Sequence, residues 1–193
     1  MNHRHFIIHK PYGYLSQFKY ELKRKKKLLG ELFDFPIGTM AIGRLDEDSE
    51  GLLLLTTDGK VSDFICSSKV DKEYYVQVDG IINDKAITQL QNGVEIGFEG
   101  KKYTTKPCHA FILESIPDFG PRAKKIRDER HGPTSWASIT VNEGKFRQVR
   151  KMTSAVGFPT LRLVRVRIGT IHLNDLQSGK SLEVPELIIN PKP

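Results

Sequence analysis

The chain has 193 residues, 38% hydrophobic and 27% charged, which suits one globular core or a core split into two lobes. Its formal net charge of +7 favours a polyanionic partner. The two cysteines lie far apart and outside any CxxC spacing, which argues against a disulfide scaffold and a zinc ribbon. No apolar run reaches the roughly 18 residues that span a membrane. The N-terminus lacks the features of a secretory signal, so we expect a cytoplasmic protein without membrane contact.

The first expected element is a strand at residues 5–9 (HFIIH), ended by a turn that contains Pro11 and Gly13. Three histidines, His3, His5 and His9, fall in or near this strand. No acidic or cysteine ligand accompanies them, so we expect an exposed N-terminal segment and no metal site.

Residues 19–27 (KYELKRKKK) carry six cations against one glutamate, and such a run repels itself. The pattern predicts a loop or arm. Either its cations are simply solvated, or they contact a phosphate backbone, in which case Lys25 and Lys26 are the candidates. Residues 28–35 are expected to form one or two helical turns that stop at Pro36.

Residues 40–60 (MAIGRLDEDSEGLLLLTTDGK) are the most informative stretch of the chain. The four leucines at 52–55, closed by Asp58-Gly59, predict a strand that is buried on both faces. An acidic loop between two apolar strands is a costly place for charge unless the loop faces a cleft. We therefore predict that Asp46 is the reacting group of an enzyme.

The remaining pattern predicts a mixed α+β chain without regular βαβ alternation. We expect helices at 59–67, 84–92 (with Asp84 near the N-cap) and 146–156, and strands at 73–79, 94–96, 101–105, 107–114 and 136–141. Residues 161–173 are expected to form a long strand or a hairpin arm. Residues 117–135 form a long loop rich in Lys and Arg. Contact with RNA and a flexible insert are equally good interpretations of that loop.

The acidic loop also suggests two other sites. Asp46, Asp48, Glu50 and Gly51 occupy the first, third, fifth and sixth positions of an EF-hand calcium loop. The twelfth position, which requires a glutamate, is Thr57, and the flanking runs resemble strands, so calcium is disfavoured. A glycosidase with two carboxylates stays open, because sequence spacing does not fix a carboxylate separation. Nucleophile-elbow, dinucleotide and P-loop motifs are absent.

A reactive carboxylate in a dry pocket needs a cation beside it. At about 100° per residue, the expected helix at 146–156 groups Phe146, Val149, Met152, Thr153 and Val156 on one face. Arg147 and Lys151 lie on the other face, and Arg150 falls at the boundary, where it can reach a cleft. An ordinary amphipathic helix with a solvated basic face explains the pattern equally well.

An enzyme that acts on a base of structured RNA needs an aromatic surface for the extruded base. Tyr74, Tyr75 and Tyr103 are available. Tyrosines in strands are more often packing residues, and pattern alone does not choose between the two roles.

The motifs together resemble the RsuA-type ribosomal RNA pseudouridine synthases over about residues 5–185. The resemblance rests on Lys10-Pro11 with Gly13, on GRLD at 43–46 continued by SEGLLLLT at 49–56, on KEYYV at 72–76, on EGKFRQVRKM at 143–152, and on LVR at 163–165. The match in the second of these motifs is highly specific.

The resemblance implies a pseudouridine synthase fold, α+β, with a mixed and largely antiparallel sheet, flanking helices and a basic central cleft. In that fold Asp46 would be the catalytic aspartate, Tyr74 the ring that stacks on the uracil, and Arg150 the cation paired with Asp46. The resemblance extends to further RNA-binding residues with less specific roles: Arg44, Lys10, Arg147, Lys151 and Leu163.

The chain departs from the family pattern in two respects. The first motif begins within ten residues, so we expect residues 1–193 to be a single catalytic domain, with two lobes allowed and no N-terminal S4 domain. The architecture is most similar to the RluE branch, which modifies large-subunit ribosomal RNA. Phe146 stands where relatives often carry a polar residue, which puts RNA contact by this side chain in doubt.

The sequence thus predicts a site-specific isomerase that converts a uridine of large-subunit (23S) ribosomal RNA to pseudouridine. This chemistry implies no cofactor and no metal, and we expect a monomer whose partner is ribosomal RNA. The rivals are a non-catalytic RNA-binding module for ribosome assembly and a calcium-binding protein.

Overall fold

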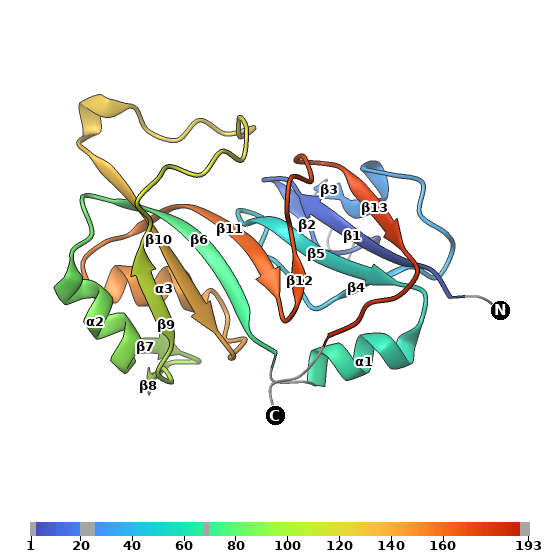
Figure 1. Cartoon of the computed structure of the whole chain (residues 1–193), viewed down its shortest axis with the longest axis horizontal. Coiled ribbons are helices and arrows are strands. Elements are labelled where there is room, and N and C mark those ends of the chain that lie inside the picture. Colours follow the sequence, from blue (N-terminus) through green and yellow to red (C-terminus); the bar gives the residue numbers. More distant parts are fainter. Residues whose placement is uncertain (1–2, 20–25, 68–69, 190–193) are drawn as a thin grey trace. The chain divides into compact units, whose positions relative to one another are not determined.

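The computed structural model describes residues 3–19, 26–67 and 70–189 and divides the chain into two compact units (Figure 1). Unit 1 contains Met1–Val70, Phe119–Lys124 and Arg165–Pro193, and unit 2 contains Asp71–Asp118 and Lys125–Val164. The chain passes between the units within strand β11 (Thr160–Ile168).

Unit 1 is built on an antiparallel sheet around β1 (His5–Lys10), which pairs with β13 (Ser181–Val184) on one side and β5 (Glu50–Thr56) on the other. Strand β4 (Met40–Ile42) also pairs with β5, and β11 turns back into β12 (Ile171–His172). Every residue of β5 is buried, which confirms the prediction of a strand covered on both faces. Helix α1 (Gly59–Ser67) follows it with the predicted bounds.

The histidines of β1 correct the expectation of an exposed N-terminal segment. His5 and His9 are only 8% and 2% exposed, because β1 lies between two strands. His5 shares a hydrogen bond with Thr56 Oγ1 at 2.9 Å, and His9 contacts the carbonyl of Leu176 at 2.7 Å. Their separate partners make them structural residues of the sheet.

The segment after β1 is short and irregular. Strands β2 (Tyr14–Leu15) and β3 (Lys27–Leu28) pair in parallel, and the 3-10 turn η1 (Leu29–Glu31) follows them. This turn confirms the expected short helical segment. Residues 20–25, including Lys25, lie outside the described residues.

Unit 2 contains strands in the order β11, β6 (Lys72–Asp79), β10 (Thr134–Val141) and β9 (His109–Ile112). The β6–β10 and β10–β9 pairings are antiparallel. Helix α2 (Asp84–Asn92) packs against β9, and α3 (Gln148–Ala155) packs against the hairpin of β7 (Glu95–Phe98) and β8 (Lys101–Thr104). The core between them includes Val76, Leu90, Ile139, Met152 and Leu163.

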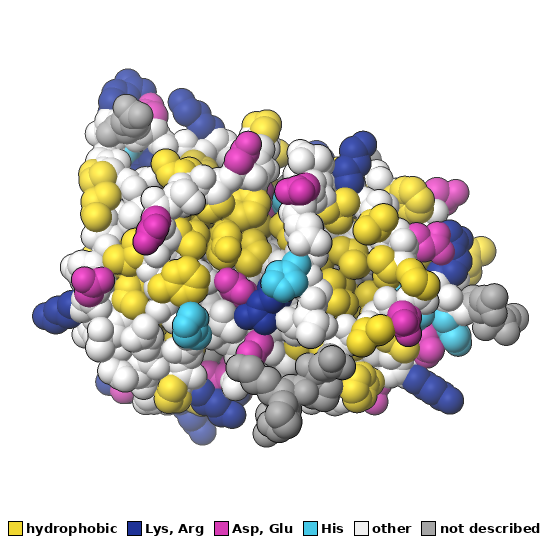
Figure 2. All heavy atoms as spheres, viewed as in Figure 1, with side chains coloured by type: hydrophobic (Ala, Val, Ile, Leu, Met, Phe, Trp, Pro, Cys, Tyr) yellow, Lys and Arg dark blue, Asp and Glu magenta, His cyan; other side chains and the backbone are white. Residues whose placement is uncertain are grey.

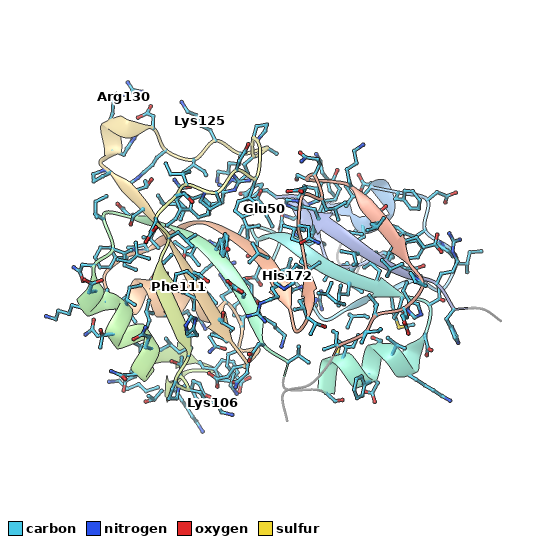
Figure 3. The ribbon with its side chains drawn as sticks, in the orientation of Figure 1. Glu50, Lys106, Phe111, Lys125, Arg130 and His172 are labelled. Atoms are coloured by element: carbon cyan, nitrogen blue, oxygen red, sulfur yellow. The ribbon has the colours of Figure 1, made fainter. Side chains whose placement is uncertain are left out.

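An ion pair fastens the loop before β10 to the sheet of unit 2. Arg127 makes a bidentate ion pair with Asp79 of β6, close to the 3-10 turn η2 (Glu129–His131). Lys125 and Arg130 point outward from the 125–131 segment (Figure 3), where dark-blue cationic side chains stand out at the upper left of the surface (Figure 2). The loop is thus anchored through Arg127 and presents other cations to solvent.

The predicted start of one helix is wrong by two residues. Helix α3 begins at Gln148 instead of Phe146, because Arg147 adopts a left-handed conformation (φ 53°, ψ 33°). Phe146 therefore lies outside the helix and is 65% exposed, contrary to its predicted place on the apolar face. Helix α2 has the predicted bounds, and Asp84 lies next to its N-cap, Asn83, whose side chain accepts a hydrogen bond from the Ala86 N–H at 3.0 Å.

The predicted α+β class with a mixed, largely antiparallel sheet is confirmed. Several strands differ from expectation: β9 is shorter than the predicted 107–114, and β2, β3 and β13 are not among the predicted strands. In the described part of the chain the longest helices, α1 and α2, have 9 residues, too few and too polar for a membrane span.

Candidate active site

Asp46 lies half-buried in the turn that joins β4 to β5. The turn is closed by a hydrogen bond of 3.0 Å from the Ser49 N–H to the Asp46 carbonyl. Gly43, with φ +69°, allows the chain to leave β4 in a conformation that other residues rarely adopt. The carboxylate is thus carried by a short connection between two paired strands.

Neighbouring segments hold this turn in place. Ser16 is 7% exposed, and its hydroxyl both donates to the Leu45 carbonyl (2.8 Å) and accepts from the Leu45 N–H (2.9 Å). The N–H of Gly13 donates to the carbonyl of Glu47 at 2.8 Å. The residues on both sides of Asp46 are therefore fixed by the 13–16 segment, which limits the positions open to its carboxylate.

Lys10 is fully buried beside this turn. Its ammonium donates to the carbonyls of Pro11 (3.0 Å) and Tyr14 (2.8 Å). Burial lowers the pKa of Lys10 from 10.5 to about 7, although the negative charges of Glu50, Asp48 and Asp46 act in the opposite direction. The predicted RNA-binding lysine thus lies inside the protein, where it shapes the acidic loop.

Arg165 is a buried cation that our sequence analysis did not assign to the site. It is 3% exposed, its Nε donates to the Leu52 carbonyl at 2.8 Å, and its charge contributes to lowering the pKa of Lys10. Its Nη2 is buried and has no hydrogen-bond partner among the residues that the structure describes. The sequence shows only an arginine within the apolar strand pattern at 161–168. Such a pattern does not distinguish an arginine that is buried in a sheet from one at a sheet edge.

Two predicted RNA-binding cations of unit 1 lie at or beside the acidic turn. The half-buried Lys26 donates to both carboxylate oxygens of Glu47, at 2.8 and 3.0 Å. The exposed Arg44, two residues before Asp46, donates to the side-chain oxygen of Gln17 at 2.7 Å. Lys26 therefore contacts the residue after Asp46, and Arg44 precedes Asp46 in the same turn.

Unit 2 holds Tyr74 and Leu163 together. Tyr74, on β6 opposite Ile139 of β10, is half-buried and packs against the core cluster that contains Leu163. Leu163 is 5% exposed on β11. Tyr74 thus has the support that a stacking ring requires, and Leu163 is a packing residue of the same cluster.

Helix α3 and strand β7 border a shallow hollow of about 540 Å³ within unit 2. Its lining includes Arg147, Arg150, Lys151, Ser154, Glu95 and Gly97. The Lys151 ammonium donates to the Gly97 carbonyl at 2.8 Å. Three predicted cations thus share one hollow that has a single carboxylate in its lining.

The predicted residues fall into two groups. Unit 1 gathers Lys10, Lys26, Arg44 and Asp46, and unit 2 gathers Tyr74, Arg147, Arg150, Lys151 and Leu163. The pairing of Asp46 with Arg150 stays a prediction. A calcium loop does not fit, because the stretch from Glu50 to Thr56 is a fully buried strand and not a loop between helices.

The site consists of a carboxylate on a hydrogen-bonded turn, followed by a buried strand of a mixed sheet. The chain belongs to the RNA pseudouridylate synthase family, whose sequence model matches residues 4–155. The matched region includes Asp46, Tyr74 and Arg150. The protein is accordingly an RNA pseudouridine synthase of the RsuA-like type, as the motifs predicted.

Individual relatives show which members of the family are most similar in sequence to this chain. The chain is 42% identical over 176 residues to ribosomal large subunit pseudouridine synthase E of Xanthomonas campestris pv. campestris, covering 90% of this chain and 91% of that one. It is 41% identical to the Vibrio parahaemolyticus protein of the same name, with 95% and 74% covered. It is 31% identical to ribosomal large subunit pseudouridine synthase B of Bacillus subtilis, with 93% and 67% covered.

A solved structure supports the fold. A crystal structure of a pseudouridylate synthase superimposes with a TM-score of 0.74 at 26% sequence identity, covering 94% of this chain and 70% of that one. The order of strands and helices described above is therefore that of a pseudouridine synthase fold.

Proposed function

We propose that this protein converts one uridine of large-subunit (23S) ribosomal RNA to pseudouridine, with Asp46 as the reacting carboxylate. The observation that carries the proposal is the pinned, half-buried turn of Asp46 within the region matched by the family. The names of the most similar relatives support large-subunit ribosomal RNA as the substrate. We place the enzyme in the cytoplasm, where it acts as a monomer.

The reaction needs only a bond exchange within one nucleotide. The bond between C1′ and N1 breaks as the Asp46 carboxylate either attacks C1′ or removes a proton from the sugar. The uracil stays bound and rotates, and C5 forms a new bond to C1′ as the bond between Asp46 and C1′ breaks or, in the second route, as the sugar regains its proton. The C5 proton leaves, and N1 takes up a proton. No electron is gained or lost, so the isomerisation requires no redox partner.

Each further residue has a role in this proposal. Tyr74 stacks on the flipped uracil, supported from behind by its core contacts. Arg150 is the cation that pairs with the Asp46 carboxylate. Arg44 helps to displace the flipped base or takes its place in the stack, and Arg147 and Lys151 contact phosphates. Because Lys10 is fully buried, its role is to hold the shape of the Asp46 turn.

Tritium release tests the proposal directly. With 23S ribosomal RNA labelled at uracil C5, we expect the wild type to release tritium and Asp46→Asn to release none above background. The substitution keeps the size of the side chain, so RNA binding should be retained. Normal tritium release by Asp46→Asn would remove Asp46 from the chemistry.

The same preparation separates the rival functions. A non-catalytic assembly module would bind the RNA and leave its nucleoside composition unchanged after nuclease digestion. Pseudouridine mapping in ribosomal RNA of a strain that lacks the gene would then identify the target. We expect one large-subunit uridine to remain unmodified in that strain.

A further inference from the structure

Aromatic rings and lysines alternate on the surface of unit 2, next to the hollow between β7 and α3. The Lys145 ammonium lies 4.6 Å from the ring centroid of Phe98 and 4.9 Å from that of Tyr103. The Lys151 ammonium lies 5.4 Å from the ring centroid of Phe146 and 5.9 Å from that of Phe98. We call these five residues the Phe146 platform.

A partly buried hydrogen-bond network around Glu143 holds Tyr103 of the platform. The Tyr103 hydroxyl donates to Glu143, whose carboxylate also accepts from the Lys106 N–H (3.0 Å) and from the Gln148 side chain (2.8 Å). Glu143 thereby connects strand β8 to the start of α3 and to Lys106, which follows β8 and is labelled in Figure 3. The rings are thus held on ordered backbone.

Phe146 itself is 65% exposed, which removes it from the core of unit 2. The left-handed conformation of the next residue, Arg147, separates Phe146 from helix α3. A non-glycine residue in that conformation costs roughly 1–2 kcal/mol, and such strain clusters at functional sites. A large exposed ring beside a strained residue and a cationic hollow calls for a functional explanation.

We infer that the Phe146 platform binds an unpaired nucleotide of the RNA substrate, at a position that flanks the target uridine. The base stacks on the ring of Phe146, and the adjoining phosphate contacts Lys151 at the rim of the hollow. The inference rests on the proposed function for its substrate class and adds a second contact to it, distinct from the uracil that Tyr74 receives.

Charge and size both favour this occupant. The hollow has three cations and one carboxylate in its lining, and that carboxylate, Glu95, is already paired with Lys102 at 2.8 Å. Its volume of about 540 Å³ lies in the range of small-ligand sites. Rings interleaved with cations are the usual surface for single-stranded nucleic acid, because every base can stack whatever its sequence. A duplex would leave the exposed ring without a base to cover it.

A fluorescent base tests the platform. A short unpaired RNA that contains 2-aminopurine should lose fluorescence on binding to the wild type and to Phe146→Tyr. Phe146→Ala should abolish this quenching and raise the RNA concentration for half-maximal tritium release about 10-fold, since one base stack contributes roughly 1–3 kcal/mol. The single-turnover rate at saturating RNA should stay unchanged, because Phe146 does not touch the reacting uridine.

Two further variants control the result. Phe64→Ala on α1, where the ring is 53% exposed, removes a comparable surface ring in unit 1 and should change neither readout. Phe146→Leu keeps an apolar side chain without a ring and should behave like Phe146→Ala. Wild-type quenching and affinity in Phe146→Ala, or in Phe146→Leu, would overturn the platform.

Different results would contradict the proposed function and the Phe146 platform. If the wild type binds and quenches the labelled RNA but releases no tritium from 23S ribosomal RNA, the proposed function is wrong while the platform stands. If tritium is released normally and Phe146→Ala has no effect on half-saturation or quenching, only the platform is wrong.

Discussion

The carboxylates of Asp46, Glu47 and Glu50 differ in their burial and in their contacts. Glu50 is 1% exposed at the start of β5, where Figure 3 labels it, and Glu47 is bound to Lys26. Asp46 is half-buried on a turn whose backbone is fixed on both sides. A side chain with partial access and a fixed backbone meets the geometric need of a reacting group better than a buried one.

Ser16 should matter for catalysis without touching the substrate. Ser16→Ala removes both hydrogen bonds to Leu45 and leaves a buried N–H and carbonyl without their partner, at a cost of about 1–3 kcal/mol. We expect the tritium-release rate to fall about 10-fold or more, since small displacements of a reacting group are costly. Thermal unfolding and the rate at saturating RNA measure the two effects.

Unit 2 offers a matched control for Ser16. The Ser135 hydroxyl likewise accepts from a backbone N–H, that of Ile82 (2.8 Å), and donates to a carbonyl, that of Gly80 (2.9 Å). Ser135→Ala should lower stability by a similar amount and leave the saturated rate unchanged. Equal losses of rate in both variants would show that Ser16 acts only through stability.

Lys10 gives the protein a pH-dependent stability. Its folded pKa of about 7 lies below the 10.5 of an unburied lysine, so the unfolded chain binds more protons above pH 7. The free energy of unfolding therefore rises with pH from about 7 to 9, by up to about 1.4 kcal/mol per unit from this group. Urea denaturation across this range should show the rise in the wild type.

Lys10→Met should flatten that rise, because the variant has no ammonium to bury. The range stops at about pH 9 because burial raises the pKa of Cys108 from 9.0 to about 11, which opposes the trend at higher pH. An unchanged pH slope in Lys10→Met would assign the titration to another group.

At the scale of elements, backbone conformation decides where helix α3 begins. Arg147 keeps a left-handed conformation that glycine adopts without strain. Arg147→Gly should therefore be more stable than Arg147→Ala, by up to about 1 kcal/mol, although both lose the same cation. Chemical denaturation measures the difference, and both variants should bind RNA equally weakly. A less stable Arg147→Gly would mean that the flexibility of the unfolded chain outweighs the strain.

The elements also show what the sequence could predict. Local patterns placed α1 at 59–67 and the buried strand β5 correctly, because apolar spacing and turn residues determine both locally. The start of α3 was missed because left-handed Arg147 leaves no mark in residue type. Strand β13 was missed because its pairing with β1 joins residues far apart in the chain.

The candidate site, like the elements, could be predicted only in part from the sequence. A specific motif pointed to Asp46, and a pinned turn at that position supports its choice. The burial of Lys10 and Arg165 was not predictable, since charged residues next to strands are usually solvated. Their burial follows from the strands that close over them, which depends on the whole sheet.

At the scale of the whole molecule, the net charge of +7 predicts RNA binding that weakens with salt. Lys124→Gln combined with Lys125→Gln should lower the slope of log affinity against log salt by about 1.5, if both lysines contact phosphates. Binding titrations at several salt concentrations measure the slope. Lys60→Gln, an exposed lysine on α1, is the control and should leave it unchanged. An unaltered slope in the double variant would favour a flexible insert.

The division of the chain has a consequence for its synthesis. Unit 2 is drawn almost entirely from the middle of the sequence, whereas β1 of unit 1 needs Ser181–Val184 as one of its two neighbours. During translation β1 emerges before the residues of unit 2, and β13 emerges after them. Unit 2 can assemble its core before β13 is made, so the edge of β1 that β13 covers stays open to wrong strand pairing while unit 2 is synthesised.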